Sequence, residues 1–172
     1  MVFPRHVDDV IAAVAVCREH DAAVLTRGAG TSLAGQGCNA AVVIDTSKHL
    51  NRIVDLDPDR RIARVEPGVI LDDLRDAAER HGLTFGPDPS THASCTIGGM
   101  IGNNACGVHS LMAGKTVENT EALDVLTYDG DRFITGPTPD DELSHIMSSN
   151  DRRAEIYRRL RDLRGDAAEH GR

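Results

Sequence analysis

The sequence is poor in several features that point to particular classes of protein. Trp is absent, and two Tyr and three Phe are the remaining aromatic residues, so the chain has little with which to stack single-stranded nucleic acid. Positive charge is in the minority, because 19 Lys and Arg stand against 27 Asp and Glu and leave a net charge of −8. A chain of that charge repels polyanions at long range, which argues against nucleic acid and anionic membranes as partners.

Membrane spans, zinc motifs and disulfide frameworks are not indicated either. The sequence has no run of about 18 apolar residues and therefore predicts no transmembrane helix. The four cysteines form no C-x-x-C pair, and no signal peptide is recognised before the first helix. We therefore expect reduced thiols, no metal site and a cytoplasmic protein.

Apolar spacing predicts a mixture of helices and strands in a chain long enough for one domain or two small lobes. Antiparallel hairpins are prominent, which favours an α+β fold over a doubly wound parallel sheet. Gly and Pro dominate residues 86–107, to which we assign no helix or strand. The predicted helices cover residues 7–17, 70–82, 138–147 and 154–165, and the predicted strands lie at 22–27, at 40–45 and in hairpins at 50–66 and 122–135.

Two glycine-rich segments are the strongest indication of function. The first glycine segment is TRGAGTSLAGQG, residues 26–37, and the second is STHASCTIGGMIGNNACG, residues 90–107. Glycines let the backbone approach a ligand closely and adopt positive φ, and consecutive N–H groups in such turns bind anions. Two such segments suit an elongated, doubly phosphorylated cofactor that lies between two lobes.

The first segment departs from the two commonest phosphate-binding motifs. The P-loop pattern begins at Gly30 and Gly35, but Gln36 stands where the phosphate-binding Lys belongs. The dinucleotide fingerprint begins at Gly28 and Gly30 and then has Leu33 in place of its third glycine. Glycines that only form turns, a nucleotide site without redox function and a structural remnant without a ligand all stay open from the residues alone.

Several motifs occur in one order along the chain and together resemble a known family. They are PRHVDDV, RGAGTSLAGQG, VVIDTS, VEPGV, GPDPST, CTIGGMIGNNACG and AGKTVENTEALDVLTYDG. In this order they resemble the FAD-linked oxidases of the vanillyl-alcohol oxidase (PCMH-type) superfamily over about residues 2–135. Within it they most resemble the group of the glycolate oxidase D-subunit and the D-lactate and D-2-hydroxyglutarate dehydrogenases, in particular the branch fused to an iron–sulfur half.

The resemblance implies a PCMH-type FAD-binding domain built from two α+β subdomains. It places the first subdomain at residues 1–66, the second at 67–136, and a helical extension leading to a substrate cap at 137–172. We expect this domain to be incomplete, because the cap and the C-terminal part of the family are missing from the sequence. The catalytic residues are expected in that cap, and this chain alone is expected to be inactive.

The resemblance also implies which residues hold the cofactor. Some relatives attach the flavin through a histidine at the position of Thr31, and threonine cannot form that bond, so a noncovalent FAD is expected. Backbone N–H donors that stabilise the reduced flavin are expected in the second segment. The residues expected to contact FAD are Arg27, Gly28, Ala29, Gly30, Thr31, Ser32, Leu33, Pro87, Ser94, Cys95, Gly98, Gly99, Gly102, Asn104 and Gly107.

The activity that the resemblance implies is oxidation of a D-2-hydroxy acid of the lactate, glycolate or 2-hydroxyglutarate type by hydride transfer to flavin N5. An iron–sulfur or other electron-acceptor partner would take the electrons, and an iron–sulfur cluster is expected only in a separate part of the protein. His92 lies in the second segment, but the sequence identifies no carboxylate partner for it, which favours a structural or solvent-exposed role.

Overall fold

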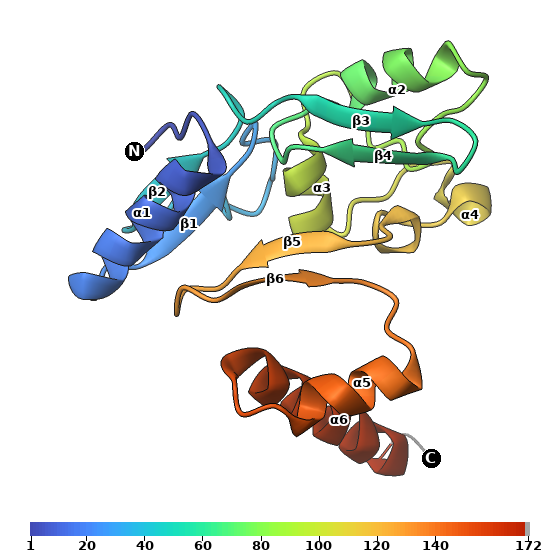
Figure 1. Cartoon of the computed structure of the whole chain (residues 1–172). Coiled ribbons are helices and arrows are strands. Elements are labelled where there is room, and N and C mark those ends of the chain that lie inside the picture. Colours follow the sequence, from blue (N-terminus) through green and yellow to red (C-terminus); the bar gives the residue numbers. More distant parts are fainter. Residues whose placement is uncertain (171–172) are drawn as a thin grey trace. The chain divides into compact units, whose positions relative to one another are not determined.

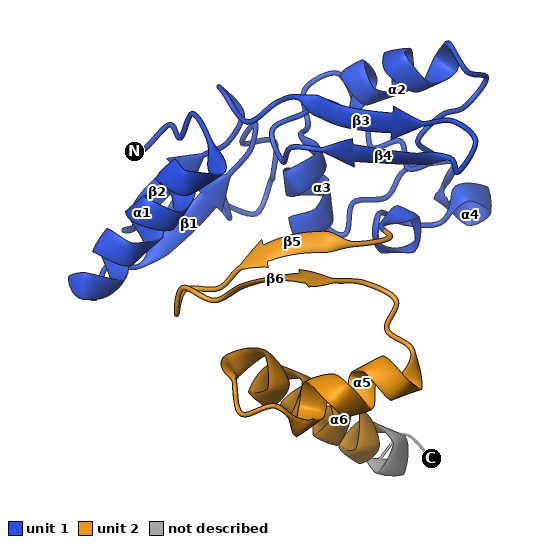
Figure 2. Ribbon diagram, viewed as in Figure 1, with its two compact units in different colours: residues 1–120 blue, residues 121–172 orange. Residues whose placement is uncertain are grey.

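The computed structural model describes residues 1–170, and their side chains as far as residue 167. The contacts divide the chain into two compact units, unit 1 (Met1–Thr120) and unit 2 (Glu121–Arg172), which are coloured separately in Figure 2. The expected subdomain boundaries at 66/67 and 136/137 stay predictions. No helix in the described part combines the length and the apolar character needed to cross a membrane.

Unit 1 begins with a helix and a pair of parallel strands (Figure 1). Helix α1 (Val7–Glu19) begins where the Asp9 carboxylate accepts hydrogen bonds from the backbone N–H groups of Arg5 and His6, and it buries Val14 and Cys17. Strands β1 (Val24–Arg27) and β2 (Val42–Asp45) pair in parallel, and Val2 forms a parallel bridge to Ile44. The predicted helix and both predicted strands are confirmed, and the first glycine segment connects the strands.

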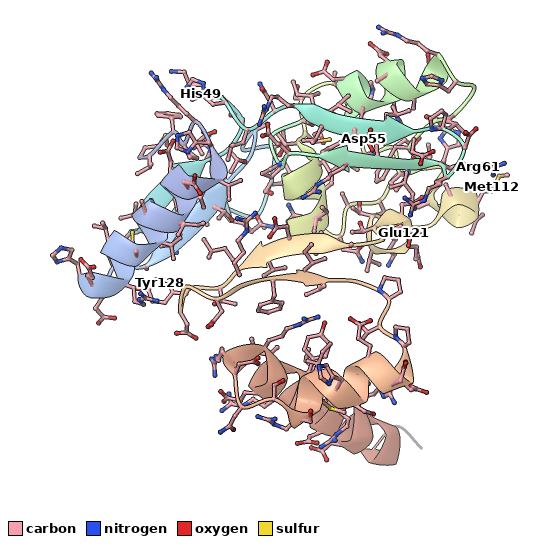
Figure 3. The ribbon with its side chains drawn as sticks, in the orientation of Figure 1. His49, Asp55, Arg61, Met112, Glu121 and Tyr128 are labelled. Atoms are coloured by element: carbon pink, nitrogen blue, oxygen red, sulfur yellow. The ribbon has the colours of Figure 1, made fainter. Side chains whose placement is uncertain are left out.

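The rest of unit 1 is built around one apolar core. Strands β3 (Ile53–Asp57) and β4 (Ile62–Val65) form the predicted antiparallel hairpin, with Asp55 on β3 and Arg61 in the connecting turn (Figure 3). Helix α2 (Leu71–Glu79) confirms the helix expected after this hairpin. The core beneath these elements consists of Val69, Leu71, Leu74, Cys95, Ile97 and Met100.

A helix that the sequence analysis did not predict lies inside the second glycine segment. Helix α3 (Ile97–Asn103) begins where the Thr96 hydroxyl accepts a hydrogen bond from the Gly99 N–H at 3.2 Å, and it ends at Asn104 with φ of 47°. The glycines disfavour a helix in isolation, but burial of Ile97 and Met100 in the core offsets that cost. Helix α4 (Ser110–Ala113) and a 3₁₀ turn, η1 (Val117–Asn119), follow.

Unit 2 contains a hairpin and two helices, as predicted. Strands β5 (Leu123–Leu126) and β6 (Arg132–Thr135) pair in antiparallel fashion around a turn in which Gly130 has φ of +96°. Helices α5 (Asp140–Ser148) and α6 (Arg152–His170) pack together and bury Ile146 and Ala154. Mixed helices, two antiparallel hairpins and one parallel pair confirm the α+β prediction.

Candidate functional site

The first glycine segment follows strand β1, and its backbone N–H groups are available as hydrogen-bond donors. Gly30 and Gly35 adopt φ of 71° and 83°, the left-handed region that a side chain makes costly. Among the described residues, no hydrogen bond is donated by a backbone N–H of residues 28–37. Consecutive unused N–H groups around positive-φ glycines form the arrangement in which backbone binds phosphate and other anions.

Arg27 brings a cation directly to this segment. Its Nε is buried, and the structure offers it no hydrogen-bond acceptor within the described residues. A Cβ on Gly30 would lie 2.6 Å from Arg27 Nη2, so the guanidinium lies directly against the glycine segment. An arginine with a buried donor left over is well suited to an anionic ligand on that segment.

The two glycine segments contact one another within unit 1. A Cβ on Gly28 would lie 2.0 Å from the Thr96 hydroxyl, a distance that only glycine permits there. The Asn103 Nδ2 donates to the Ser32 hydroxyl at 3.0 Å, and the Gln36 Nε2 donates to the Asn103 Oδ1 at 3.3 Å. The side chain at the end of α3 therefore connects the second segment to the first.

The backbone donors of the second segment are used differently from the expectation. The N–H of Gly98 donates to the Pro67 carbonyl at 2.8 Å, and that of Gly99 donates to the Thr96 hydroxyl. The N–H groups of Ser94 and Cys95 both donate to the Thr91 carbonyl at 2.8 Å. The expected second set of free N–H donors is therefore not present at these positions, because a capped helix and a tight turn use them.

A cleft of about 330 Å³ opens beside the contact between the segments. We call it the unit-1 cleft. Its wall consists mostly of small residues, both apolar and polar, with Asp73 as its one carboxylate. Its lining residues are Ala29, Ser47, Asn51, Gly68, Ile70, Asp73, Ala93, Ser94 and Thr96.

A turn at Pro67 and Gly68 supports this cleft. A Cβ on Gly68 would lie 2.2 Å from the Thr46 carbonyl oxygen, so the backbones touch there. The turn follows Glu66, whose carboxylate pairs with Arg52 at 2.7 Å and also accepts from the Arg52 N–H at 2.8 Å. The guanidinium lowers the pKa of Glu66 below its ordinary value, since it favours the ionised form.

Several of the expected FAD contacts lie in or beside the contact region. Ala29 and Ser94 line the unit-1 cleft, and Ser32 takes part in the hydrogen bonds with Asn103. Leu33 is completely exposed, and a Cβ added to Gly102 on α3 would have nothing within 4 Å. Exposed apolar and glycine positions of this kind leave room for a ligand.

Other expected contacts are engaged elsewhere. Cys95 is buried in the core, where removal from water raises the pKa of its thiol. The Pro87 carbonyl accepts from Arg75 at 3.2 Å, and Gly107 packs directly on the Asp88 backbone. The Asn104 Oδ1 accepts a hydrogen bond from the Val117 N–H at 3.0 Å. The side chain that contacts the first segment is that of the neighbouring residue, Asn103.

The sequence analysis missed some residues of the site. Thr96 was not among the expected contacts, although a threonine before apolar residues at helical spacing signals an N-cap. Asn103 was not among them either, and no local signal separates it from Asn104. His92 does have a carboxylate partner, Asp72, at 2.7 Å, because α2 brings Asp72 beside the second segment; the imidazole is half exposed, with 49% of its side-chain surface accessible.

Comparison with known proteins identifies the family. The family model described as an FAD binding domain matches residues 1–136. The chain belongs to this FAD-binding domain family. Its PCMH-type fold and its cofactor, FAD, were both implied by the sequence motifs and are confirmed by this match.

Curated relatives of this FAD-binding domain carry the names of hydroxy-acid enzymes. The D-2-hydroxyglutarate dehydrogenase of Escherichia coli K12 is 36% identical over 160 residues, which are 91% of this chain and 16% of the relative. Glycolate oxidase subunit GlcD of the same organism is 39% identical over 79% of the chain and 28% of its own length. The D-lactate dehydrogenase of Archaeoglobus fulgidus is 36% identical over 76% of the chain and 29% of its own length.

The chain thus spans between 16% and 29% of the length of these relatives. A solved structure of alkyldihydroxyacetonephosphate synthase superposes with a TM-score of 0.68 at 18% identity, over 79% of this chain and 25% of that one. At that identity the likeness shows the fold of the FAD-binding domain. The motif-based recognition of the family is confirmed.

The residues present in the FAD-binding domain fit a dinucleotide cofactor. The first segment supplies unused N–H groups, Arg27 supplies a cation with an unsatisfied buried donor, and Gly28 leaves no space for a side chain against Thr96. These are donors and a close backbone approach, which a diphosphate requires. In the part of the chain whose side chains are described, no group of three or more His, Cys, Asp or Glu is placed to hold a metal ion.

Proposed function

We propose that this FAD-binding domain is part of a flavin-dependent oxidoreductase that oxidises a D-2-hydroxy acid. Family membership and three relatives named for D-2-hydroxyglutarate, glycolate and D-lactate support the substrate class. The observation that carries the cofactor side is the first glycine segment, with free N–H donors beside the buried Nε of Arg27. The N–H donors and Arg27 together favour an elongated anionic ligand that is held mainly by the protein backbone.

Each element of the site has a role in this proposal. The N–H groups of residues 28–33 bind the diphosphate, and Arg27 adds the positive charge that the segment otherwise lacks. Asn103 holds the first segment against α3, and the unit-1 cleft receives part of the bound molecule. Of the contacts predicted from the sequence, Arg27 to Leu33, Ser94 and Gly102 are proposed to meet FAD directly. The others are engaged within unit 1 and are proposed to shape the second segment around the cofactor: Pro87, Cys95, Gly98, Gly99, Asn104 and Gly107.

The cofactor brings the redox chemistry, and the protein places it. When bound, FAD supplies the hydride acceptor at flavin N5. Thr31 has no ring nitrogen with which to form a covalent flavin bond, which supports noncovalent binding. We assign the groups that select the hydroxy acid and take its proton, and any iron–sulfur or other electron acceptor, to parts of a longer protein that correspond to the unmatched length of the relatives.

A titration of the purified chain tests the cofactor assignment. FAD and FMN are each added while flavin fluorescence is followed, and ADP, which has no flavin, is measured by its displacement of bound FAD. We expect FAD to bind roughly tenfold or more tightly than FMN, because FMN lacks half of the diphosphate and the adenosine. Equal affinity for FAD and ADP would favour a nucleotide site without a flavin role, and no binding by a cooperatively folded chain would contradict the proposal.

Two arginine variants locate the binding in that titration. Arg27→Gln removes the cation beside the first segment, and we expect FAD affinity to fall by roughly tenfold. Arg60→Gln is the matched control, because Arg60 is exposed in the turn between β3 and β4. An Arg27 variant that binds FAD as the wild type does would remove Arg27 from the site.

A further inference from the structure

Unit 2 contains a second cleft, of about 590 Å³, which the proposed function does not use. We call it the unit-2 cleft. It lies between β6, the segment that follows β6, and the first turns of α5 and α6. Its lining residues are Ala122, Arg132, Phe133, Ile134, Gly136, Pro137, Thr138, Glu142 and Arg153.

Arg153 is the distinctive residue of this cleft. Its guanidinium carbon lies 6.0 Å from the centre of the Phe133 ring and 5.5 Å from that of Tyr157, so two aromatic side chains hold it. Its Nε is buried and has no hydrogen-bond acceptor, and no ion pair to it is found among the side chains that the structure describes. Stacking holds the position of the guanidinium but satisfies none of its N–H donors.

Neighbouring arginines of the same unit are used differently. Arg152 pairs with Asp129 at 3.0 Å and with Glu155 at 2.7 Å. Arg158 donates to the Met147 carbonyl at 2.6 Å. Arg132, the other cation of the cleft, is bound in bidentate fashion by Asp124. The Nε of Arg152 is likewise buried without an acceptor, but its terminal nitrogens are paired with carboxylates. For Arg153 no such pairing is found among the side chains that the structure describes.

The walls of the cleft restrict the kind of molecule that can meet those donors. Phe133, Ile134 and Pro137 provide apolar surface, and Ile134 keeps 59% of its surface exposed. The planar fork of a guanidinium matches a carboxylate in bidentate geometry. Glu142 places a negative charge on the same cleft, which disfavours a dianion more than a monoanion.

We propose that the unit-2 cleft binds a small monocarboxylic acid with an apolar body, whose carboxylate pairs with Arg153 and whose carbon skeleton lies against Phe133 and Pro137. None of its lining residues is among those assigned to FAD, so its test does not depend on the flavin.

The experiment titrates the ¹⁵N-labelled whole chain with benzoate and hexanoate, and with acetate and inorganic phosphate, while backbone resonances are followed. We expect benzoate and hexanoate to cause saturable shifts at Phe133, Ile134 and Arg153, with affinity about tenfold higher than that of acetate because of the added apolar contact. Arg153→Gln weakens benzoate binding at least roughly tenfold. Arg159→Gln, which changes an exposed arginine further along α6, leaves it unchanged.

A second variant keeps the proposal testable if Arg153→Gln disturbs the fold. Glu142→Gln removes the negative charge from the cleft without touching Arg153, and we expect benzoate to bind about threefold more tightly. Absence of saturable shifts, equal binding by the Arg153 variant, an unchanged affinity after Glu142→Gln, or phosphate and acetate binding as tightly as benzoate would each overturn the proposal.

Discussion

Asn103 and Asn104 are identical residues at adjacent positions, yet they face different parts of unit 1. Asn104 ends α3 in the left-handed conformation and accepts the Val117 N–H, while Asn103 still belongs to the helix and contacts Ser32 and Gln36. A change of backbone conformation between the two residues sends their side chains in different directions. Sequence alone could not separate them, because the end of α3 was not predicted.

This difference leads to a prediction for Asn103. Asn103→Ala removes the hydrogen bonds to Ser32 and from Gln36, so we expect FAD affinity to fall about fivefold while the free energy of unfolding falls by about 1 kcal/mol or less. Fluorescence titration and urea unfolding measure the two quantities. Asn150→Ala, an exposed change in unit 2, serves as the control. A loss of stability without a loss of affinity would show that Asn103 has no positioning role.

Glu66 gives unit 1 a pH-dependent contribution to stability. Its pKa is lowered by Arg52, so the folded state favours the ionised carboxylate. The stabilisation by ionised Glu66 is fully present above pH 4.5, the ordinary pKa of a glutamate. It is lost as the pH falls from there through the lower pKa that Glu66 has in the folded state. We therefore expect Glu66→Gln to be less stable than the wild type at pH 7 and to approach it in acid.

Urea unfolding across this pH range measures the effect of Glu66. Glu79→Gln is the matched control, since Glu79 is exposed on α2 and makes no ion pair among the described side chains. A stability difference between Glu66→Gln and the wild type that stayed constant from neutral pH into acid would contradict the linkage.

At the scale of elements, periodic segments were predictable and α3 was not. The hairpins at β3–β4 and β5–β6 alternate apolar and polar residues around turns with strong signals, and α1 and α2 carry apolar residues at helical spacing. In α3, three glycines conceal the spacing of Ile97 and Met100. Its stability comes from tertiary burial, which local propensity does not register.

Two glycines of α3 offer a matched test of that packing. A Cβ on Gly98 would lie 2.9 Å from the Pro67 carbonyl oxygen, whereas one on Gly102 would meet nothing within 4 Å. We expect Gly98→Ala to lower the free energy of unfolding by about 1–3 kcal/mol and Gly102→Ala to raise it by about 0.5–1 kcal/mol. Thermal or urea unfolding distinguishes them, and equal effects of the two changes would show that α3 does not pack on Pro67 as described.

At the scale of the whole molecule, the order of motifs carried more information about the site than any single motif. The first segment lacks the Lys of a P-loop and the third glycine of a dinucleotide fingerprint. It therefore indicated a cofactor site only when it was considered together with the second segment. What the motifs could not provide is the contact between segments, such as Gly28 against Thr96, because residues that far apart meet only through the fold. They also could not reveal that α3 uses the N–H groups of Gly98 and Gly99.

The central claim is that both glycine segments of unit 1 form one FAD site. The most direct measurement is a titration of the ¹⁵N-labelled chain with FAD, in which the backbone resonances of both segments are followed. The account predicts that residues 27–33 and the residues around Ser94, Thr96 and Asn103 shift together with one dissociation constant. Shifts confined to one segment, or two segments that titrate with different constants, would contradict a single shared site.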